Sequence, residues 1–344
     1  MRHASDSRPL LAITMGDPAG IGPEIVLKAL RHPEVFTSAR PLVLGDRRIL
    51  RRAAEWVGPP TPEIEVVRTP AEAHFGPRTL TLLDLENASP AACPPGEISA
   101  AAGRAAVEYV LTATDLAIEG RIDAIVTAPL NKAAMNAAGF HYAGHTELLA
   151  ERTGTPNVKM LLVGPKLRVI HVSTHVALTE AIRRITAANV LAAIELAQES
   201  TQALGIPRPR IAVAGLNPHA SEGGLFGDEE ARAVVPAIAE ARARGYDVSD
   251  PQPPDTVFLR AVNGAYDVVV AMYHDQGHIP MKLLAFDSGV NVSIGLPIIR
   301  TSVDHGTAFD IAGSGKAREA SLLAAIDIAV KMAEARRLRE GGAR

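Results

Sequence analysis

The sequence predicts an α/β fold in which helices cover mainly parallel sheets. Short apolar runs alternate with longer helical patterns along the 344 residues, an order typical of strand–helix repeats. Hydrophobic residues make up 47% of the chain and aromatic residues only 4%, so the core must be built from Ala, Val, Leu and Ile. Aliphatic cores of this kind suit helices packed on a parallel sheet.

Each predicted strand contains β-branched residues or Leu and ends near Gly, Pro or Asp. The predicted strands are Leu10–Met15, Pro41–Leu44, Thr79–Leu83, Ile122–Thr127, Met160–Val163, Arg168–Val172, Arg210–Ala214 and Asp267–Met272. Because ligands of parallel α/β folds bind at the carboxyl ends of strands, the loops that follow these segments are the places to look for chemistry.

The predicted helices carry recognisable start and stop signals. They are Pro23–Leu30, Ser99–Glu119, Thr186–Leu204, Asp228–Arg244 and Ala317–Leu338. Ser99 and Thr186 are suitable N-caps, because a hydroxyl can accept a hydrogen bond from an open N–H of the first turn. Gly120, Gly205 and Gly245 are suitable residues to follow a helix end, where a left-handed backbone is common.

Composition and charge exclude several classes of protein. The net charge of −3 does not favour nucleic acid or an anionic membrane as the main partner. Cys93 is the one cysteine, which excludes an intramolecular disulfide and a thiolate metal cluster and fits a reducing cytoplasm. The apolar run Leu10–Ile13 is too short for a signal-peptide core, and no stretch approaches the roughly 20 apolar residues of a membrane span.

Three histidines follow predicted strands and could form a metal site. His175, His219 and His274 each lie shortly after a strand, at spacings too long for a local metal-binding finger. Three imidazoles with an open coordination position would make a catalytic site for a divalent ion. Single histidines are more often hydrogen-bonded structural residues, and the two interpretations stay open on position alone.

A glycine-rich turn joins the first strand to the first helix. The segment Gly16–Glu24 contains Gly20 and Gly22 but has Ile25 where a dinucleotide fingerprint requires its third glycine. An anion site at the helix start and a tight structural turn are equally compatible with this pattern. The pair Gly315–Lys316 lacks the earlier glycine of a phosphate loop, so an ATP site is excluded.

Basic residues that could hold a phosphate or carboxylate are few near these motifs. Lys282 lies eight residues after His274, and Arg300 follows the last apolar run. A guanidinium can bind a carboxylate or phosphate through two parallel hydrogen bonds. The alternative for both residues is a surface salt bridge, the commoner role of Lys and Arg.

Taken together, these motifs resemble the 4-hydroxythreonine-4-phosphate dehydrogenase family from about Leu10 to Ala333. The segments that carry the resemblance are Met15–Glu24, Thr127–Lys132, Gly144–Glu147, Leu216–Ala220, Tyr273–Gly277 and Gly295–Ala308. So many separate matches make a chance resemblance implausible.

The resemblance implies a role for individual residues. The metal ligands are His175, His219 and His274, holding a divalent ion such as Zn, Mg or Co. The substrate contacts are His145, Thr146, Lys282, Asn291 and Arg300. Asp255 and Asp275 match acidic residues of the active-site region and join Lys282 as candidates for proton transfer.

The family is also distantly similar in fold to isocitrate and isopropylmalate dehydrogenases. This similarity implies two α/β/α domains with a cleft between them. Residues 1–130 and 285–344 would form a cofactor-side domain, and residues 131–284 a domain for metal binding and dimer formation. Within Asp304–Gly313, the residues Asp304, His305, Gly306, Thr307 and Asp310 would bind NAD or NADP. The resemblance further implies a cytoplasmic homodimer whose active site uses residues of both subunits.

The expected reaction is oxidation of the C3 hydroxyl of a four-carbon, 4-phosphorylated acid, followed by decarboxylation. Three acids stay open as substrates: 4-hydroxythreonine, D-threonate and D-erythronate, each as its 4-phosphate. The products would be 3-amino-2-oxopropyl phosphate or dihydroxyacetone phosphate. The segment His278–Asp287 departs from the pattern of the vitamin B6 pathway branch and looks more like the sugar-acid branch.

Three other functions stay open. A related branch oxidises cis-dihydrodiols of aromatic acids, which carry no phosphate. A non-catalytic metabolite-binding relative would keep the fold and lose the chemistry, although the presence of all three histidines argues against it. A metal-dependent hydrolase would need no nicotinamide cofactor, and the cofactor-like loop Asp304–Gly313 argues against that class.

Overall fold

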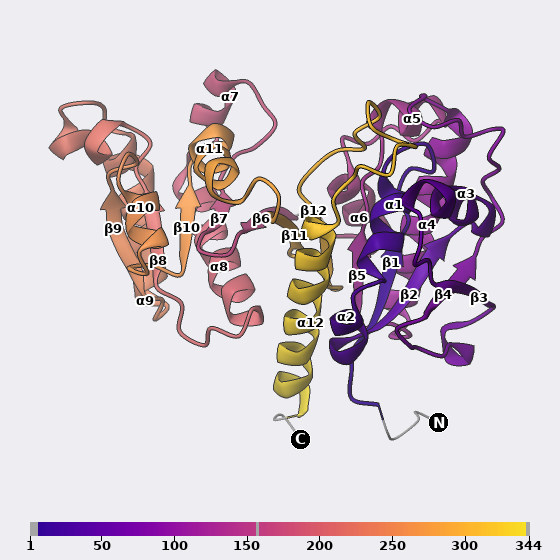
Figure 1. Ribbon diagram of the computed structural model, residues 1–344. Coiled ribbons are helices and arrows are strands. Elements are labelled where there is room, and N and C mark those ends of the chain that lie inside the picture. Colours follow the sequence, from indigo (N-terminus) through magenta and orange to yellow (C-terminus); the bar gives the residue numbers. More distant parts are fainter. Residues whose placement is uncertain (1–5, 156–157, 342–344) are drawn as a thin grey trace. The chain divides into compact units, whose positions relative to one another are not determined.

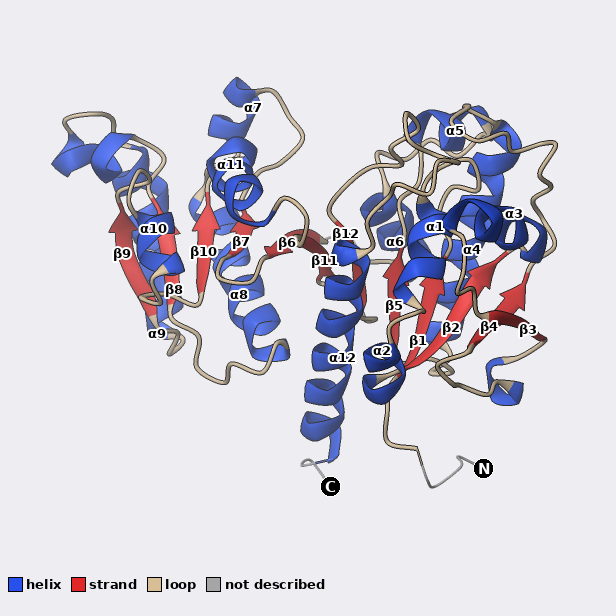
Figure 2. Ribbon diagram, in the orientation of Figure 1, coloured by secondary structure: helices blue, strands red, loops and turns tan. Residues whose placement is uncertain are grey.

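The computed structural model describes residues 6–155 and 158–341 and divides the chain into two compact units. The first unit runs to Val158 and resumes at Leu296, and the second comprises Lys159–Gly295. Each unit contains strands with helices packed on them (Figures 1 and 2), which confirms the predicted α/β class. Among the described helices, none is long and apolar enough to cross a membrane.

The first unit contains a parallel sheet with the strand order β3-β4-β2-β1-β5-β12. Its strands are β1 (Leu10–Thr14), β2 (Arg40–Gly45), β3 (Glu63–Val67), β4 (Thr79–Asp84), β5 (Ala124–Thr127) and β12 (Arg300–Val303). Its helices are α1 (Gly22–Ala29), α2 (Pro33–Ser38), α3 (Arg47–Val57), the 3-10 turn Pro70–Glu72, α4 (Ala100–Ile118), α5 (Lys132–Ala137), α6 (His145–Thr153) and α12 (Ala320–Gly341).

Helices pack on this sheet in two groups. The helix α12 contacts β5 and β12, on the face where the Thr301 hydroxyl donates to the carbonyl of Ala325 over 2.8 Å. Helices α1 and α2 contact α12, and α3 contacts α1. The helix α4 contacts β1, β2 and β5, and α5 and α6 pack against it. The buried apolar residues of these strands are mainly Leu, Ile, Val and Ala, as the low aromatic content requires, and buried polar residues stand among them near the carboxyl end of β5 and in β12.

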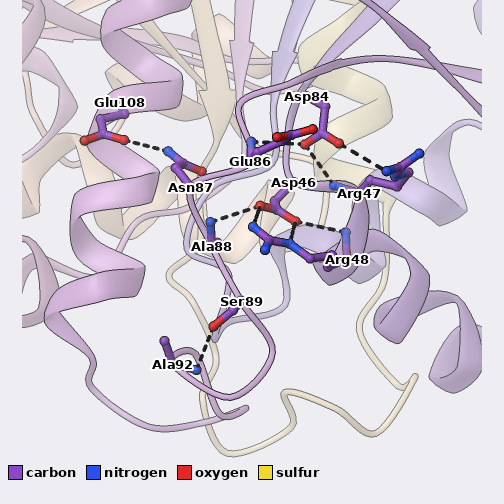
Figure 3. A network of polar contacts seen from close by, with 10 residues as sticks. All are labelled: Asp46, Arg47, Arg48, Asp84, Glu86, Asn87, Ala88, Ser89, Ala92 and Glu108. Carbon is purple, nitrogen blue, oxygen red and sulfur yellow. Dashed lines mark hydrogen bonds and ion pairs between the residues drawn. The ribbon is translucent and has the colours of Figure 1, made fainter.

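Acidic side chains lie at the carboxyl ends of β2 and β4 (Figure 3). Asp46 is buried and caps α3, where it accepts hydrogen bonds from the backbone N–H of Arg48 at 2.9 Å and from that of Ala88 at 3.0 Å. The Arg48 guanidinium also donates to both oxygens of this carboxylate. Burial alone would raise the pKa of Asp46, but these hydrogen bonds lower it overall. Asp84 accepts the N–H of Arg47 at 3.2 Å, so both strand ends are fixed to the start of α3.

The second unit has the strand order β11-β6-β7-β10-β8-β9. Its strands are β6 (Lys159–Val163), β7 (Arg168–His171), β8 (Ile211–Ala214), β9 (Val248–Gln252), β10 (Val268–Ala271) and β11 (Val290–Ile294). Strands β7, β10, β8 and β9 are parallel, whereas β6 is antiparallel to both β7 and β11. The prediction of mainly parallel sheets is therefore confirmed.

Helices cover the second sheet as they do the first. They are α7 (Leu178–Arg183), α8 (Ala187–Ala203), the 3-10 segment Pro218–Gly224, the π-helical turn Glu230–Val234, α9 (Val235–Ala243), α10 (Val257–Val262) and α11 (His274–Ala285). Alternate strand residues such as Ala212, Ala214, Val269 and Ala271 pack in one core with α10 and α11. The helix α8 contacts β6, β7, β8 and β10 and packs against α9.

The helix-end signals agree with the structure. The side chains of Ser99 and Thr186 cap α4 and α8, and Gly120, Gly205 and Gly245 follow helix ends with positive φ. The helix expected over Asp228–Arg244 is confirmed as a continuous helical segment over residues 229–243, in which a π-helical turn precedes α9 and Pro236 stands in the first turn of α9. A proline has no N–H to donate and therefore interrupts the regular hydrogen-bond pattern.

The units divide at different residues from those expected. The first unit continues past residue 130 to Val158, because α5 and α6 pack against α4. The second unit continues past residue 284 to Gly295, because β11 pairs with β6 from Val290↔Val163 to Ile294↔Lys159. Strand pairing and helix packing therefore set boundaries that no change of composition marks.

Candidate functional site

A buried arginine lies at the centre of a polar site in the first unit. Arg300, the first residue of β12, is 2% exposed, and its Nη2 donates to the hydroxyl of Thr127 over 2.7 Å. Thr127 is the buried last residue of β5, the strand that pairs with β12. Burial lowers the pKa of Arg300 to about 9, and the charge of Glu147 opposes this shift. The guanidinium therefore keeps its proton at neutral pH.

The start of α6 belongs to the same site. His145 is the first residue of α6, and burial together with the charge of Arg300 holds its pKa well below the usual range. The ring is therefore neutral at neutral pH. Its Nε2 atom is buried and has no hydrogen-bond partner among the described residues. Gly144 precedes His145 and cannot supply a side-chain cap, so N–H groups of the first turn are open to an anion.

This arrangement is suited to binding an anion. A buried guanidinium is stabilised by a phosphate or carboxylate, and two-point hydrogen bonding fixes the orientation of the bound group. The neutral His145 ring and the helix start add hydrogen-bonding groups for the anion, while Glu147 in the same first turn adds a negative charge. The structure brings together three residues expected to contact substrate, which are His145, Thr146 and Arg300.

The remaining substrate-contact candidates lie in the second unit. Lys282 lies on α11, with its Nζ 5.6 Å from the ring centre of Phe286. Asn291 lies on β11, and its Nδ2 approaches the sulfur of Met160 at 2.7 Å. Asp255, a candidate for proton transfer, lies on an exposed turn just before α10.

The three candidate metal ligands follow three neighbouring strands of the second sheet. His175 follows β7, His219 follows β8 and His274 follows β10, and β10 pairs with both β7 and β8. The rings of His175 and His274 have centres 5.5 Å apart. His219 lies on an exposed loop, with its ring centre 6.2 Å from that of Phe226.

His274 has the surroundings of a metal ligand. Its Nδ1 lies 2.7 Å from a carboxylate oxygen of Asp275. A carboxylate at Nδ1 leaves Nε2 as the atom available to a metal, a common second contact of metal-bound histidines. The same ring stacks on His278, with ring centres 3.7 Å apart. The ring centres of His171 and His278 are 4.7 Å apart. Burial lowers the pKa of His171 to about 3.

The donor set fits a divalent metal in chemistry and in strand position. Imidazole nitrogen binds Zn, Co and related ions, and three donors leave room for a substrate oxygen. Within residues 6–155 and 158–341, no group of three or more His, Cys, Asp or Glu side chains is gathered closely enough to hold an ion. His219 lies on a segment in which residues 219–223 have positive φ values between 45° and 70°.

The candidate cofactor loop joins β12 to α12 in the first unit. No residue from Asp304 to Glu319 belongs to a helix or strand, although the loop is well connected. The N–H of Asp304 donates to the hydroxyl of Ser321 over 3.2 Å. Thr307 is buried, whereas Gly306 and Asp310 are exposed. His305 approaches the carbonyl of Gly306 at 3.0 Å through its Nδ1.

The glycine-rich turn is a packing element. A Cβ on Gly22 would lie 2.1 Å from the carbonyl oxygen of Met15, and one on Gly16 would lie 2.4 Å from that of Pro129. A Cβ on Gly20 would lie 3.0 Å from the side chain of Thr307. These close approaches explain the glycines without an anion, so the structural interpretation of the turn is favoured.

Two residues of these sites went unrecognised in the sequence. Thr127 was part of a resembling segment, but only the structure shows that its hydroxyl holds Arg300. His278 stands four residues after His274 on α11. Residues at this spacing share one helix face, and this signal could have identified the stacked pair.

The comparisons with known proteins agree with this fold. The family model for the pyridoxal phosphate biosynthetic protein PdxA matches residues 37–329. The D-threonate 4-phosphate dehydrogenase of Cupriavidus necator is 52% identical over 333 residues, covering 96% of this chain and 99% of that protein. The 4-hydroxythreonine-4-phosphate dehydrogenase of Desulforapulum autotrophicum is 48% identical over 330 residues, covering 96% and 97%.

A solved structure leads to the same conclusion. The crystal structure of 4-hydroxythreonine-4-phosphate dehydrogenase from Klebsiella pneumoniae superposes with a TM-score of 0.88 at 48% sequence identity. The match covers 96% of this chain and 99% of that one. These relatives are dehydrogenases by name, and the resemblance drawn from the sequence is confirmed. The chain belongs to the PdxA family.

Proposed function

We propose that this protein catalyses the metal-dependent, NAD(P)-linked oxidation of the C3 hydroxyl of a four-carbon, 4-phosphorylated acid. Loss of CO₂ follows, giving dihydroxyacetone phosphate from D-threonate or D-erythronate 4-phosphate, or 3-amino-2-oxopropyl phosphate from 4-hydroxythreonine 4-phosphate. D-threonate 4-phosphate is the first candidate, because the relative with 52% identity carries that substrate in its name. The segment His278–Asp287 supports the same choice.

The observation that carries this proposal is the anion site around Arg300. A buried guanidinium held by Thr127 and adjoined by the start of α6 suits the phosphate or the carboxylate of such an acid. Binding energy from a group remote from C3 can orient the reacting carbon, so this site serves catalysis as well as affinity. Thr146 and Asn291 complete the proposed set of substrate contacts.

In the same proposal His175, His219 and His274 hold the divalent ion. Bound there, the ion would act as a Lewis acid toward a substrate oxygen. Asp275 orients His274 through the 2.7 Å contact with Nδ1 and is assigned as a positioning residue. Lys282 is the candidate for proton transfer, because an amine on α11 stands on the same helix as His274. Asp255 is a second candidate for moving a proton.

The nicotinamide cofactor is assigned to the loop after β12. Asp304, His305, Gly306, Thr307 and Asp310 supply its contacts in this proposal. A long loop without regular structure inside a compact unit is commonly functional, which supports the assignment. The choice between NAD and NADP rests on which charges the loop presents to the ribose.

We also propose that the protein is a homodimer. Four large apolar side chains on or just after α11 are exposed, among them Leu283 at 83% and Phe286 at 70%, with Ile279 and Leu284 beside them in sequence. A second copy of the chain is the occupant assigned to this patch, since contiguous apolar surface is commonly covered in an assembly. In the same proposal, the active site uses residues of both subunits.

Steady-state formation of NADH or NADPH, followed by absorbance, tests the proposed function. Purified protein is supplied with Zn, Mg or Co and offered the three 4-phosphorylated acids separately. Turnover of D-threonate 4-phosphate, with dihydroxyacetone phosphate and CO₂ as products, is the expected result. Absence of turnover with all three acids, both cofactors and every metal would reject the proposal. Turnover of an aromatic cis-dihydrodiol instead would assign the protein to a different chemistry.

A further inference from the structure

One side of α1 is bonded along its length to the loop that follows β12. Ile21, Glu24, Lys28 and His32 contribute these contacts, and together they are called the α1 clasp. Spacings of three and four residues place them on the same side of the helix and its continuation. Their partners advance along the loop in the same order, from Thr307 to Glu319.

The first and second contacts hold the part of the loop assigned to the cofactor. The N–H of Ile21 donates to the carbonyl of Thr307 over 3.1 Å. One carboxylate oxygen of Glu24 accepts the N–H of Gly313 over 2.7 Å. Gly313 has a φ of +82°, a conformation that side chains rarely adopt, so this bond fixes an unusual turn of the backbone.

The remaining contacts hold the far end of the loop. Lys28 donates to the carbonyls of Gly315, over 2.7 Å, and of Ala317, over 2.5 Å. His32 approaches a carboxylate oxygen of Glu319 at 3.1 Å. This end lies beyond the residues assigned to the cofactor. Loss of the Lys28 or His32 contacts should therefore lower the affinity for the cofactor less than loss of the Glu24 contact.

Glu24 is an unusual choice for a purely structural contact. The residue is completely buried, and its second carboxylate oxygen has no hydrogen-bond partner among the described residues. Burying a carboxylate is unfavourable unless its hydrogen bonds offset the loss of solvation. The hydrogen bond to the Gly313 N–H offsets part of this cost, and it connects Glu24 to the loop.

We infer that Glu24 is a positioning residue for the nicotinamide cofactor. It holds the segment Asp304–Gly313 through the Gly313 N–H, while the glycine-rich turn provides the surface on which Thr307 packs. This inference rests on the proposed assignment of that loop to the cofactor. It gives the turn a function in cofactor binding without any direct contact to the cofactor's phosphates.

The test compares Glu24→Ala and Glu24→Gln with wild type. Dissociation constants for NADH and NADPH are measured by fluorescence titration, and amide hydrogen exchange is followed in the peptide that contains Gly313. Glu24→Ala should raise the dissociation constant of the preferred cofactor about tenfold and speed exchange at Gly313, whereas kcat at saturating cofactor and KM for the acid stay within about twofold. Glu24→Gln keeps an acceptor oxygen and should restore cofactor binding to within about threefold of wild type.

Asp46→Ala is the matched control, because Asp46 is another buried carboxylate of the first unit that accepts a backbone N–H. It should lower the free energy of unfolding without changing the affinity for the cofactor. An unchanged dissociation constant in Glu24→Ala, or an equal rise in Asp46→Ala, would overturn the inference and leave the proposed function standing. A wild-type protein that binds neither NADH nor NADPH would overturn the proposed function and the inference together.

Discussion

The Arg300 site of the first unit and the histidine loops of the second differ in how far the fold itself completes them. Arg300 is buried, hydrogen-bonded to Thr127 and adjacent to a helix start. His175 and His219 are exposed, and His219 stands on a run of left-handed backbone. Under the proposed function, core packing organises the anion site in advance, whereas a bound metal would gather the side chains of the histidine loops.

Removal of a proposed metal-binding histidine should lower the activity more than any other change, because the protein should lose the metal. In His219→Ala we expect kcat/KM to fall about 10³-fold or more, because metal polarisation contributes several kcal/mol to catalysis. Bound metal, measured by atomic emission after dialysis, should fall in parallel. The free energy of unfolding of the metal-free protein should stay within about 0.5 kcal/mol of wild type, because the side chain is exposed.

The exposed His141, which approaches Asn136 in the first unit, provides the control. His141→Ala should keep both the metal and the activity. Retention of full metal occupancy in His219→Ala would show that the three histidines do not form one site. A large loss of stability in metal-free His219→Ala would contradict the statement that its loop depends on a ligand.

Substitution of Arg300 should have the next largest effect, and it should act without loss of metal. Arg300→Met should lower kcat/KM for the phosphorylated acid about 10²- to 10³-fold, since a bidentate charged contact is lost. Thr127→Val removes only the hydroxyl that holds the guanidinium and should cost about tenfold. Kinetics at several acid concentrations separate KM from kcat, and equal activity of Arg300→Met and wild type would exclude Arg300 from the substrate site.

The exposed apolar patch on α11 is assigned to the proposed dimer interface of the second unit. Leu283→Glu should convert a dimer into a monomer, because a charge would replace an apolar side chain that the interface buries twice. Leu338→Glu is the matched control, since Leu338 on α12 is 78% exposed and Leu283 is 83% exposed. Light scattering coupled to size-exclusion chromatography measures the mass. A monomeric wild type, or a dimeric Leu283→Glu, would reject the proposed interface.

The smallest predicted effect is a change in the free energy of unfolding with pH, and it arises from a buried carboxyl in the first unit. Asp17 accepts the N–H of Ala19 over 2.8 Å, and burial raises its pKa from the ordinary value of 3.8 to about 6. Because the folded state binds this proton more tightly, the contribution of Asp17 to stability falls as pH rises from about 4 to 6. Asp17→Asn, which does not ionise, should therefore gain stability relative to wild type over that range, by an amount on the order of 1–3 kcal/mol.

Urea unfolding of both proteins at several pH values measures this difference. The sign is the informative part of the result, since a carboxyl with a lowered pKa would produce the opposite trend. A stability difference between the two proteins that does not change from pH 4 to 7 would show that Asp17 titrates normally. Activity at neutral pH should be similar in both proteins.

All eight predicted strands are present in the structure, whereas the buried strands β11 and β12 and the more polar strands β3 and β9 were not predicted. Strands such as Ile211–Ala214 are uniformly apolar, so their identity does not depend on tertiary context. Strands Glu63–Val67 and Val248–Gln252 carry charged residues or Pro, which are uncommon in strands. Both lie at the outer positions of their sheets, where such residues are tolerated because the outer edge of the strand does not pair with another described strand. Helix α11 contains Gly277 and Pro280, both poor helix formers, and its apolar positions do not repeat clearly.

The candidate site was predicted in part for a similar reason. Residues such as Arg300 and His145 could be named from motifs, but their proximity depends on the pairing of β12 with β5, which joins segments 173 residues apart. The neutral state of the His145 ring follows from burial beside Arg300, which no local pattern reports. Likewise, the α1 clasp joins Glu24 to Gly313 across the length of the chain and has no signature in either segment.

The most direct test of the central claim is the ratio of kcat/KM for D-threonate 4-phosphate to that for unphosphorylated D-threonate. The measurement uses wild-type protein with saturating metal and cofactor, and NADH or NADPH formation as the signal. A buried, preformed anion site predicts a preference of about 10³-fold or more for the phosphorylated acid. Equal values for the two acids would show that no phosphate is recognised and would contradict the function assigned to Arg300 and to the start of α6.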